Sequence, residues 1–197
     1  MQFLILRPLV GLLTLGLPLS AQMKAPGKVN PHPPAASGNP CPRPEPRPII
    51  TKGQAGVKAH AFTKAADKDS QKTEATETLE LESGDSIKIT HWGCKFIMVG
   101  FECESKARLS MPTGVAAGYL EAVKVLRQLI AVKARVGFDL EKAAKALEAQ
   151  AKDPKVSYVK PVPLAKGSRD QITVKGAGPN TAKTAGRVEF EFMRKLS

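Results

Sequence analysis

The stretch that decides the fold is Thr76–Thr90, TETLELESGDSIKIT. Leu79 and Leu81 share one face of its first half, with threonine and glutamate side chains opposite. The same alternation returns in residues 86–90, after the Ser-Gly-Asp sequence at 83–85. A period of two on both sides of such a turn is typical of a β-hairpin. We therefore expect two antiparallel strands here.

Three further segments are expected to be strands. Lys95–Glu104, KFIMVGFECE, is rich in strand-forming residues and predicts a central strand with a bulge or bend at Gly100. Gln171–Lys175 and Arg187–Arg194 both alternate, and a loop rich in Gly, Pro and Asn separates them. These two segments predict a second antiparallel pair.

Between these strand groups the hydrophobic period changes. Apolar residues of Pro112–Val136 recur at steps of three and four, which indicates an amphipathic helix with Leu126 in the middle of its buried face. Gly137 ends this helix, and Asp139 is placed to cap a second helix that runs to about Lys152. A connection this short favours an antiparallel helical hairpin.

The order β-β-β-α-α-β-β predicts an α+β domain over residues 76–197, with a mostly antiparallel sheet and the helical hairpin packed on one face. Residues 22–50 contain proline at nearly every third position, and residues 51–75 are polar and rich in alanine. We expect residues 22–75 to be a largely disordered tether, which is either a spacer or an ordinary disordered terminus.

The first residues, MQFLILRPLVGLLTLGLPLSAQ, resemble a secretory signal peptide. Arg7 precedes an apolar run, and Ser20-Ala21 supplies the small residues of a cleavage site. This layout predicts a signal peptide over residues 1–21 and a periplasmic or secreted protein without a stable membrane span after cleavage. Retention of the segment as an uncleaved anchor is the alternative.

The chain is basic, with 30 Lys and Arg, 18 Asp and Glu, and a net charge of +12. In an exported protein this excess favours an anionic partner, either an acidic protein or an anionic polymer of the cell envelope. Aromatic residues make up 5% of the chain and fall mostly on apolar faces, so the sequence argues against nucleic acid as the partner.

The three cysteines, Cys41, Cys94 and Cys103, favour one disulfide and one remaining thiol in an oxidising compartment. An unbroken strand from 95 to 104 would separate Cys94 and Cys103 by about 30 Å, too far for a disulfide. That pair therefore needs a tight hairpin near Gly100. The alternative is a disulfide between Cys41 and one of the other two cysteines.

No catalytic, metal-binding or cofactor-binding residues are predicted. His91 and Cys94 are close in sequence but should diverge on a strand, and His32 and His60 lie in other segments. The loop around Pro179 lacks the glycines of a phosphate-binding loop, and its proline removes a backbone donor.

The sequence instead predicts a small exported binding protein of the recognition, inhibitor or immunity type in a bacterial-style cell envelope. A small hydrolase that acts on envelope polymers is the first alternative, and a tethered structural module is the second. The candidate binding residues are His91, Trp92, Lys124, Arg127 and Arg135.

Overall fold

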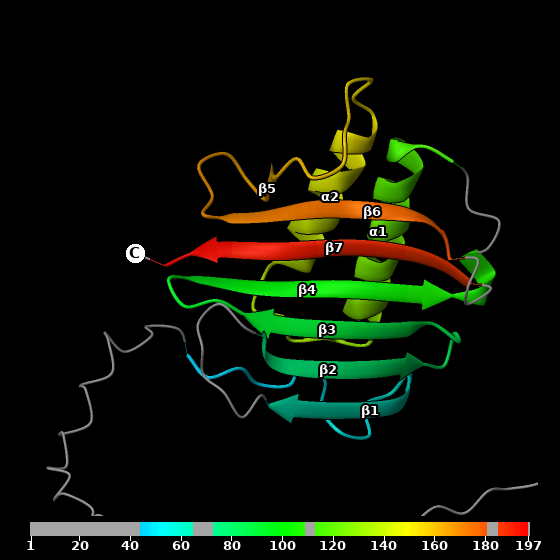
Figure 1. Ribbon diagram of the computed structural model, residues 1–197, viewed down its shortest axis with the longest axis vertical. Helices are drawn as coiled ribbons and strands as arrows, with labels where there is room; N and C mark the ends of the chain where they lie inside the picture. The colour runs from blue at the N-terminus through cyan, green and yellow to red at the C-terminus, as the bar shows by residue number, and fades with distance from the viewer. Residues whose placement is uncertain (1–43, 65–72, 109–112, 181–184, 197) are drawn as a thin grey trace, which may run out of the picture. The chain divides into compact units, whose positions relative to one another are not determined.

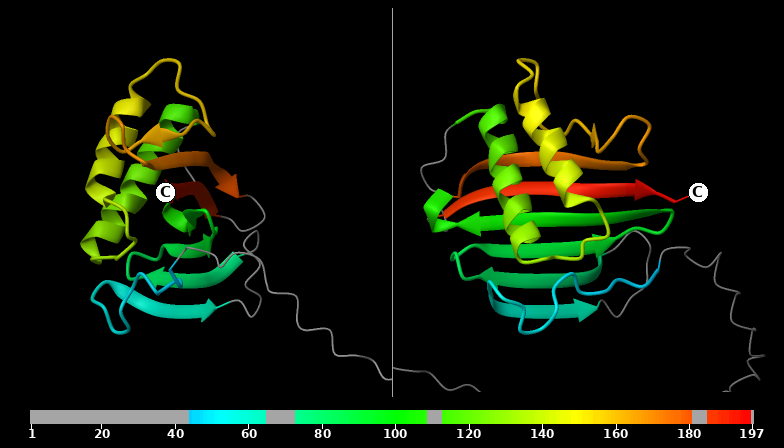
Figure 2. Two further views of the ribbon diagram at one scale, coloured as in Figure 1. Left: turned by 90° about the vertical axis from the view of Figure 1, so that its left-hand side faces the viewer. Right: turned by 180° about the vertical axis from the view of Figure 1, so that it is seen from behind.

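The computed structural model describes residues 44–64, 73–108, 113–180 and 185–196. These residues form a seven-stranded antiparallel sheet with two helices packed on one face (Figure 1). Seen from behind, both helices run across the strands, and the other face of the sheet has no helical cover (Figure 2). The predicted α+β class is confirmed.

The strand order is β1-β2-β3-β4-β7-β6-β5, and every neighbouring pair is antiparallel. The helices α1 and α2 follow β4 in the chain, and a short 3₁₀ helix, η1, precedes them. The bounds are β1 Val57–Lys64, β2 Thr73–Leu81, β3 Ser86–Trp92, β4 Phe96–Ser105, η1 Lys106–Arg108, α1 Val115–Ala131, α2 Leu140–Ala151, β5 Val162–Pro163, β6 Asp170–Asn180 and β7 Ala185–Lys195.

The predicted hairpin is β2 and β3. Its turn is closed by a hydrogen bond from the amide of Leu81 to the carbonyl of Asp85, at 2.9 Å. Gly84 has a φ of 84°, a conformation that glycine adopts without steric penalty. Leu79 lies opposite Ile87 in the register, and both side chains are buried. The alternation in the sequence therefore predicts correctly which face of the hairpin is buried in the core.

The expected bulge or bend at Gly100 is wrong. Gly100 pairs with Thr90 on β3 and with Glu191 on β7, and the register does not shift along β4. The glycine serves a packing role instead, because a side chain there would collide with Trp92. The unbroken strand also keeps Cys94 and Cys103 apart.

The tether prediction fails for its last part. We expected residues 51–75 to be loose, but β1 pairs with β2 along its length. Ile49 and Ile50 are also buried in the core. The folded domain therefore starts well before Thr76. The signal peptide and the tether up to residue 43 lie outside the described residues.

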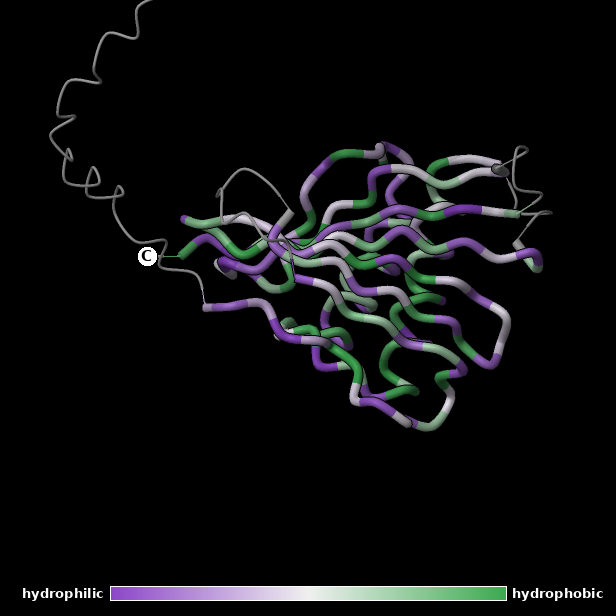
Figure 3. The backbone as a smooth tube through the Cα atoms, turned by 60° about the horizontal axis from the view of Figure 1, so that its bottom comes forward, coloured by the Kyte–Doolittle hydropathy of each residue, from purple (hydrophilic) through white to green (hydrophobic). Residues whose placement is uncertain are grey.

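Both helices pack as their periodicity indicates. Leu126 of α1 is fully buried, as expected. Asp139 caps α2, since its Oδ1 atom accepts a hydrogen bond from the amide of Lys142 at 2.9 Å. Under α1 and α2 the sheet contributes aromatic rings, and Phe101 stacks on Phe190 at 4.9 Å. Figure 3 shows the matching alternation of hydrophilic and hydrophobic residues along the strands.

Candidate functional site

The five candidate binding residues do not form one surface. Trp92 lies on the open face of the sheet, whereas His91 is buried on the opposite face of the same strand. Lys124 and Arg127 are exposed on α1, and Arg135 is exposed in the connection to α2. The structure thus separates Trp92 from the three basic residues by the thickness of the sheet, and it removes His91 from the surface.

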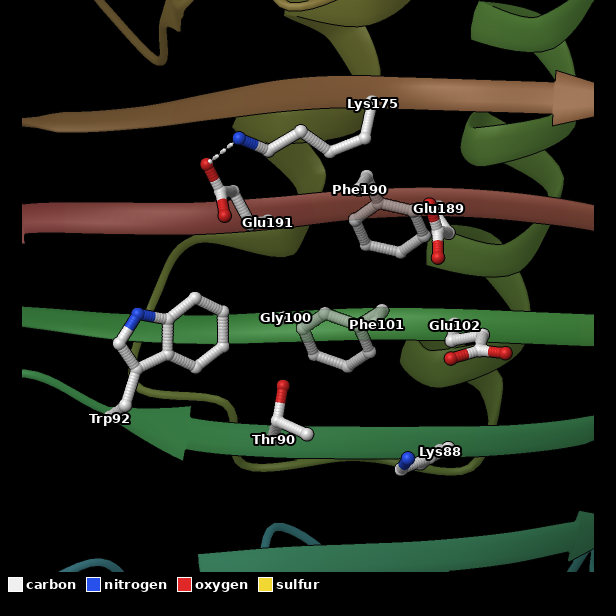
Figure 4. Close-up of a pocket in the computed structure, with 10 residues that line it drawn as sticks. All are labelled: Lys88, Thr90, Trp92, Gly100, Phe101, Glu102, Lys175, Glu189, Phe190 and Glu191. Atoms are coloured by element: carbon white, nitrogen blue, oxygen red, sulfur yellow. Dashed lines mark ion pairs between the residues drawn. The ribbon is translucent and has the colours of Figure 1, made fainter. Parts of the chain in front are cut away.

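A shallow hollow of about 180 Å³ lies on the open face of the sheet (Figure 4). Its wall on one side is the indole ring of Trp92, with the hydroxyl of Thr90 beside it. Side chains from four neighbouring strands complete it, which makes its floor rigid. The charged residues that line it are Lys88, Glu102, Lys175, Glu189 and Glu191.

The indole ring of Trp92 fills the space that Gly100 leaves on the open face. A Cβ atom at residue 100 would lie 2.8 Å from Cη2 of the indole, closer than side-chain carbons approach. Covering a strand glycine with an aromatic ring from the neighbouring strand is a known way to stabilise a sheet. The position of Trp92 therefore has a structural cause that is independent of any ligand.

The charges in the hollow compensate one another. Glu102 and Glu189 lie directly opposite on β4 and β7, which would be unfavourable for two like charges. Arg187 resolves this conflict, because its Nη2 atom pairs with Glu189 and lies 3.3 Å from Glu102. Lys175 pairs with Glu191 in the same way. The hollow therefore offers an anion no surplus of positive charge.

A second polar cluster is buried between β1, β2 and β3. Glu77 of β2 is fully buried, and its Oε1 atom lies 2.7 Å from Nε2 of His60. Nε2 of His91 lies 3.6 Å from Oε2, beyond hydrogen-bonding distance. The amides of Ile49 and Ile50 also donate to this carboxylate. Two histidines expected in unrelated segments thus converge on one carboxylate.

The environment of Glu77 favours its ionised form. Burial by itself raises the pKa of this carboxyl, but the polar groups of His91, Ile49, His60 and Ile50 together hold its pKa below the ordinary value. The carboxylate is inaccessible to a solute and is occupied by backbone amides. The cluster therefore joins residues 49 and 50 and strand β1 to strand β2 in the interior of the domain.

The sequence contains a signal for this cluster in the alternation of β2. Glu77 has the same parity in its strand as Leu79 and Leu81, so it had to lie on the buried face. A carboxylate on such a face needs partners, because an unpaired buried charge is strongly unfavourable. Its partners come from β1 and from the segment before it, which were not expected to be ordered.

The helical segment, residues 113–169, carries half of the net positive charge of the chain, +6 of +12. It contains eleven Lys or Arg and five Asp or Glu. All eleven basic side chains are exposed, whereas only Asp139 and Glu141 among the acidic ones are exposed. The six long strands together contain seven basic and eight acidic residues. The charge excess is therefore concentrated away from the sheet.

Cys103 is buried in the core and takes no part in a disulfide. The alternative that pairs it with Cys94 is therefore wrong, as the unbroken strand β4 requires. The other alternative includes Cys41, which lies outside the described residues, so it stays a prediction.

Comparison of the chain with protein-family models, with curated proteins and with solved structures finds no match in any of the three. Within the described ranges, no group of three or more His, Cys, Asp or Glu residues has the geometry to hold a metal ion. None of the helices in that part of the chain is long and apolar enough to cross a membrane.

Proposed function

We propose that this chain is an exported, non-catalytic binding protein whose helical segment contacts an anionic polymer. The observation that carries the proposal is the exposure of all eleven basic side chains of the helical segment, beside only two exposed acidic ones. Clustered lysine and arginine side chains raise the local concentration of an anionic ligand and speed its association.

The ion pairs within the helical segment leave much of this charge available. Lys124 pairs with Glu121, and Arg127 pairs with Glu148, each at 2.5 Å. Lys133, Lys145 and Lys152 are further exposed basic side chains of this segment. The strands cannot serve the same purpose, because their acidic residues offset their basic ones.

A location outside the cytoplasm would limit the kinds of anionic partner that this chain meets. A signal peptide over residues 1–21 would place the mature chain outside the cytoplasm, where phosphate-bearing envelope polymers and lipid head groups are the abundant anions. A polymer with regularly spaced phosphates can engage several lysines at once. We expect mass spectrometry of the mature protein to show a chain that begins at Gln22, directly after Ala21.

The proposal is tested by removing three charges from the helical segment and measuring binding to long-chain polyphosphate. The test variant is Lys133→Gln with Lys145→Gln and Lys152→Gln. A lysine near an anionic surface contributes about 1 kcal/mol. Three such losses predict an affinity lower by about 100-fold and a weaker dependence on salt.

The matched control removes the same net charge from the sheet, with Lys58→Gln, Lys88→Gln and Lys195→Gln. We expect this control to keep most of the affinity, because these lysines lie on or beside strands that are balanced in charge. Equal losses in both triple variants would mean that net charge alone drives binding, and the proposed surface would be wrong. Absence of binding by the unaltered chain at low salt would also reject the proposal.

A further inference from the structure

Residues 45–56, called the strap here, enter the domain before β1 and lie at the β1–β2 end of the sheet (Figure 2). The strap has no strand or helix of its own. Ile49 and Ile50 nevertheless are 3% and 2% exposed, so they belong to the core. The strap thus covers apolar surface of the core that the helices do not cover.

Two backbone amides of the strap donate to one buried side chain, Glu77. The amide of Ile49 lies 2.9 Å from Oε2 and 3.2 Å from Oε1 of Glu77, and the amide of Ile50 lies 3.2 Å from Oε1. In a strand these donors would meet carbonyl oxygens, which do not titrate. Here they meet a carboxylate, so the partner can change its charge.

Further contacts also join the strap to the rest of the domain. The amide of Arg135 donates to the carbonyl of Ile49 at 2.8 Å, and the amide of Glu82 donates to Gly56 at 3.0 Å. The ion pair between Lys64 and Glu45 is exposed, and such pairs contribute little. Glu77 is thus a charged side chain that binds the strap and is shielded from water.

Protonation of Glu77 would weaken the hydrogen bonds between its carboxylate and the strap. A protonated carboxyl keeps one good acceptor and turns its second oxygen into a donor. That donor would face an amide N–H that also needs an acceptor. The folded state favours the ionised form of Glu77, since the pKa of this carboxyl is lowered. The stabilisation it gives is therefore present above the ordinary carboxylate range and is lost as the pH falls through the lowered value.

His91 also faces Glu77 from β3. Its Nε2 atom is buried, has no hydrogen-bond partner and lies 3.6 Å from Oε2, the atom that the amide of Ile49 approaches most closely. His60 holds Oε1 from the other side at 2.7 Å. These two histidines, from β3 and β1, are the titratable groups that face Glu77. A small shift of His91 would bring Nε2 within hydrogen-bonding distance of Oε2.

We propose that Glu77 is a latch that holds residues 45–56 on the sheet when ionised and releases them on protonation, which uncovers the apolar surface under Ile49 and Ile50. The released state keeps the rest of the domain folded. The strap is thus a unit of low local stability at the amino-terminal end of the domain.

Hydrogen exchange of the full chain tests the latch, with the amides of Ile49 and Ile50 as reporters. We expect these two amides to exchange about tenfold to a hundredfold faster in Glu77→Gln than in the unaltered chain at neutral pH, the range for losing a charge-assisted hydrogen bond. Amides of α1 and β7 should keep their protection. Glu80→Gln is the matched control, since Glu80 is the next acidic residue of β2 and pairs with exposed Lys58.

The unaltered chain provides a second measurement that does not depend on the variant folding. At pH values below the ordinary carboxylate range, after correction for intrinsic exchange rates, the strap amides should lose protection before those of α1. Loss of protection in the strap and in α1 at the same pH would overturn the proposal, because Glu77 would then be an ordinary core residue. Unchanged protection of Ile49 and Ile50 in Glu77→Gln would overturn it as well.

Discussion

The indole ring of Trp92 lies against Gly100, where a Cβ atom would be 2.8 Å from Cη2 of the ring. Gly100→Ala should therefore displace the ring or shift β4, and overpacking of this kind costs about 1–3 kcal/mol. Trp92 is the sole tryptophan, so its fluorescence reports the displacement directly. Urea unfolding followed by this fluorescence measures both effects.

Gly178→Ala on β6 is the matched control for that substitution. Gly178 is also a strand glycine, but no atom lies within 4 Å of its Cβ position. We expect the control to keep the emission spectrum and the stability of the unaltered chain. An unshifted spectrum in Gly100→Ala would show that the ring does not rest on the glycine.

The buried face of α1 is tested by Leu126→Ala. Leu126 is fully buried, so the substitution should lower the free energy of unfolding by about 2–5 kcal/mol. Leu120→Ala on the same helix is the control, because Leu120 is 47% exposed and surface changes stay within about 0.5 kcal/mol. Similar losses in the two variants, measured by urea unfolding, would show that the faces of α1 are misassigned.

Arg194 joins the end of β7 to the connection between the helices. Its guanidinium donates to both carboxylate oxygens of Asp170, at 2.5 and 2.6 Å, and to the carbonyl of Gly137 at 3.1 Å. It also lies over the ring of Phe138. Arg194→Lys keeps the charge but cannot form this fork, so we expect a loss of about 1–2 kcal/mol in urea unfolding. A stability equal to that of the unaltered chain would show that the bidentate geometry contributes nothing.

The cysteines give a prediction for protein isolated from an oxidising compartment. Cys103 is buried and takes no part in a disulfide, so any disulfide within the chain joins Cys41 to Cys94. Non-reducing peptide mapping should recover that linked pair and one thiol that alkylates only after denaturation. Cys103→Ser should leave the linked pair intact. Three alkylated thiols in this sample would contradict the prediction.

The periodicity of the sequence predicted most of the fold because burial follows it directly. The alternation around residues 83–85 gave the hairpin, and the apolar stripe through Leu126 gave the buried face of α1. Strand β1 was missed because its sequence, VKAHAFTK, has few large apolar residues and lies at the edge of the sheet. Its place depends on tertiary contacts with β2, which local patterns do not contain.

Functional features were harder to predict because they depend on residues that are distant in sequence. The convergence of His60 and His91 on Glu77 requires the pairing of three strands. Gly100 was interpreted as a bend because the sequence alone does not show that Trp92 lies beside it. The charge of the chain was evident from composition, but its concentration in residues 113–169 matters only once their exposure is known.

Binding of an anionic polymer by the helical segment is measured by backbone amide chemical shifts during titration with long-chain polyphosphate. We expect the largest shifts in α1, α2 and the connections within residues 113–169, and we expect them to vanish at high salt. The amides of Trp92 and of the strands around Gly100 should shift little, because the hollow on the open face has no surplus of positive charge. Largest shifts around Trp92, with residues 113–169 unaffected, would show that the helical segment is not the binding surface.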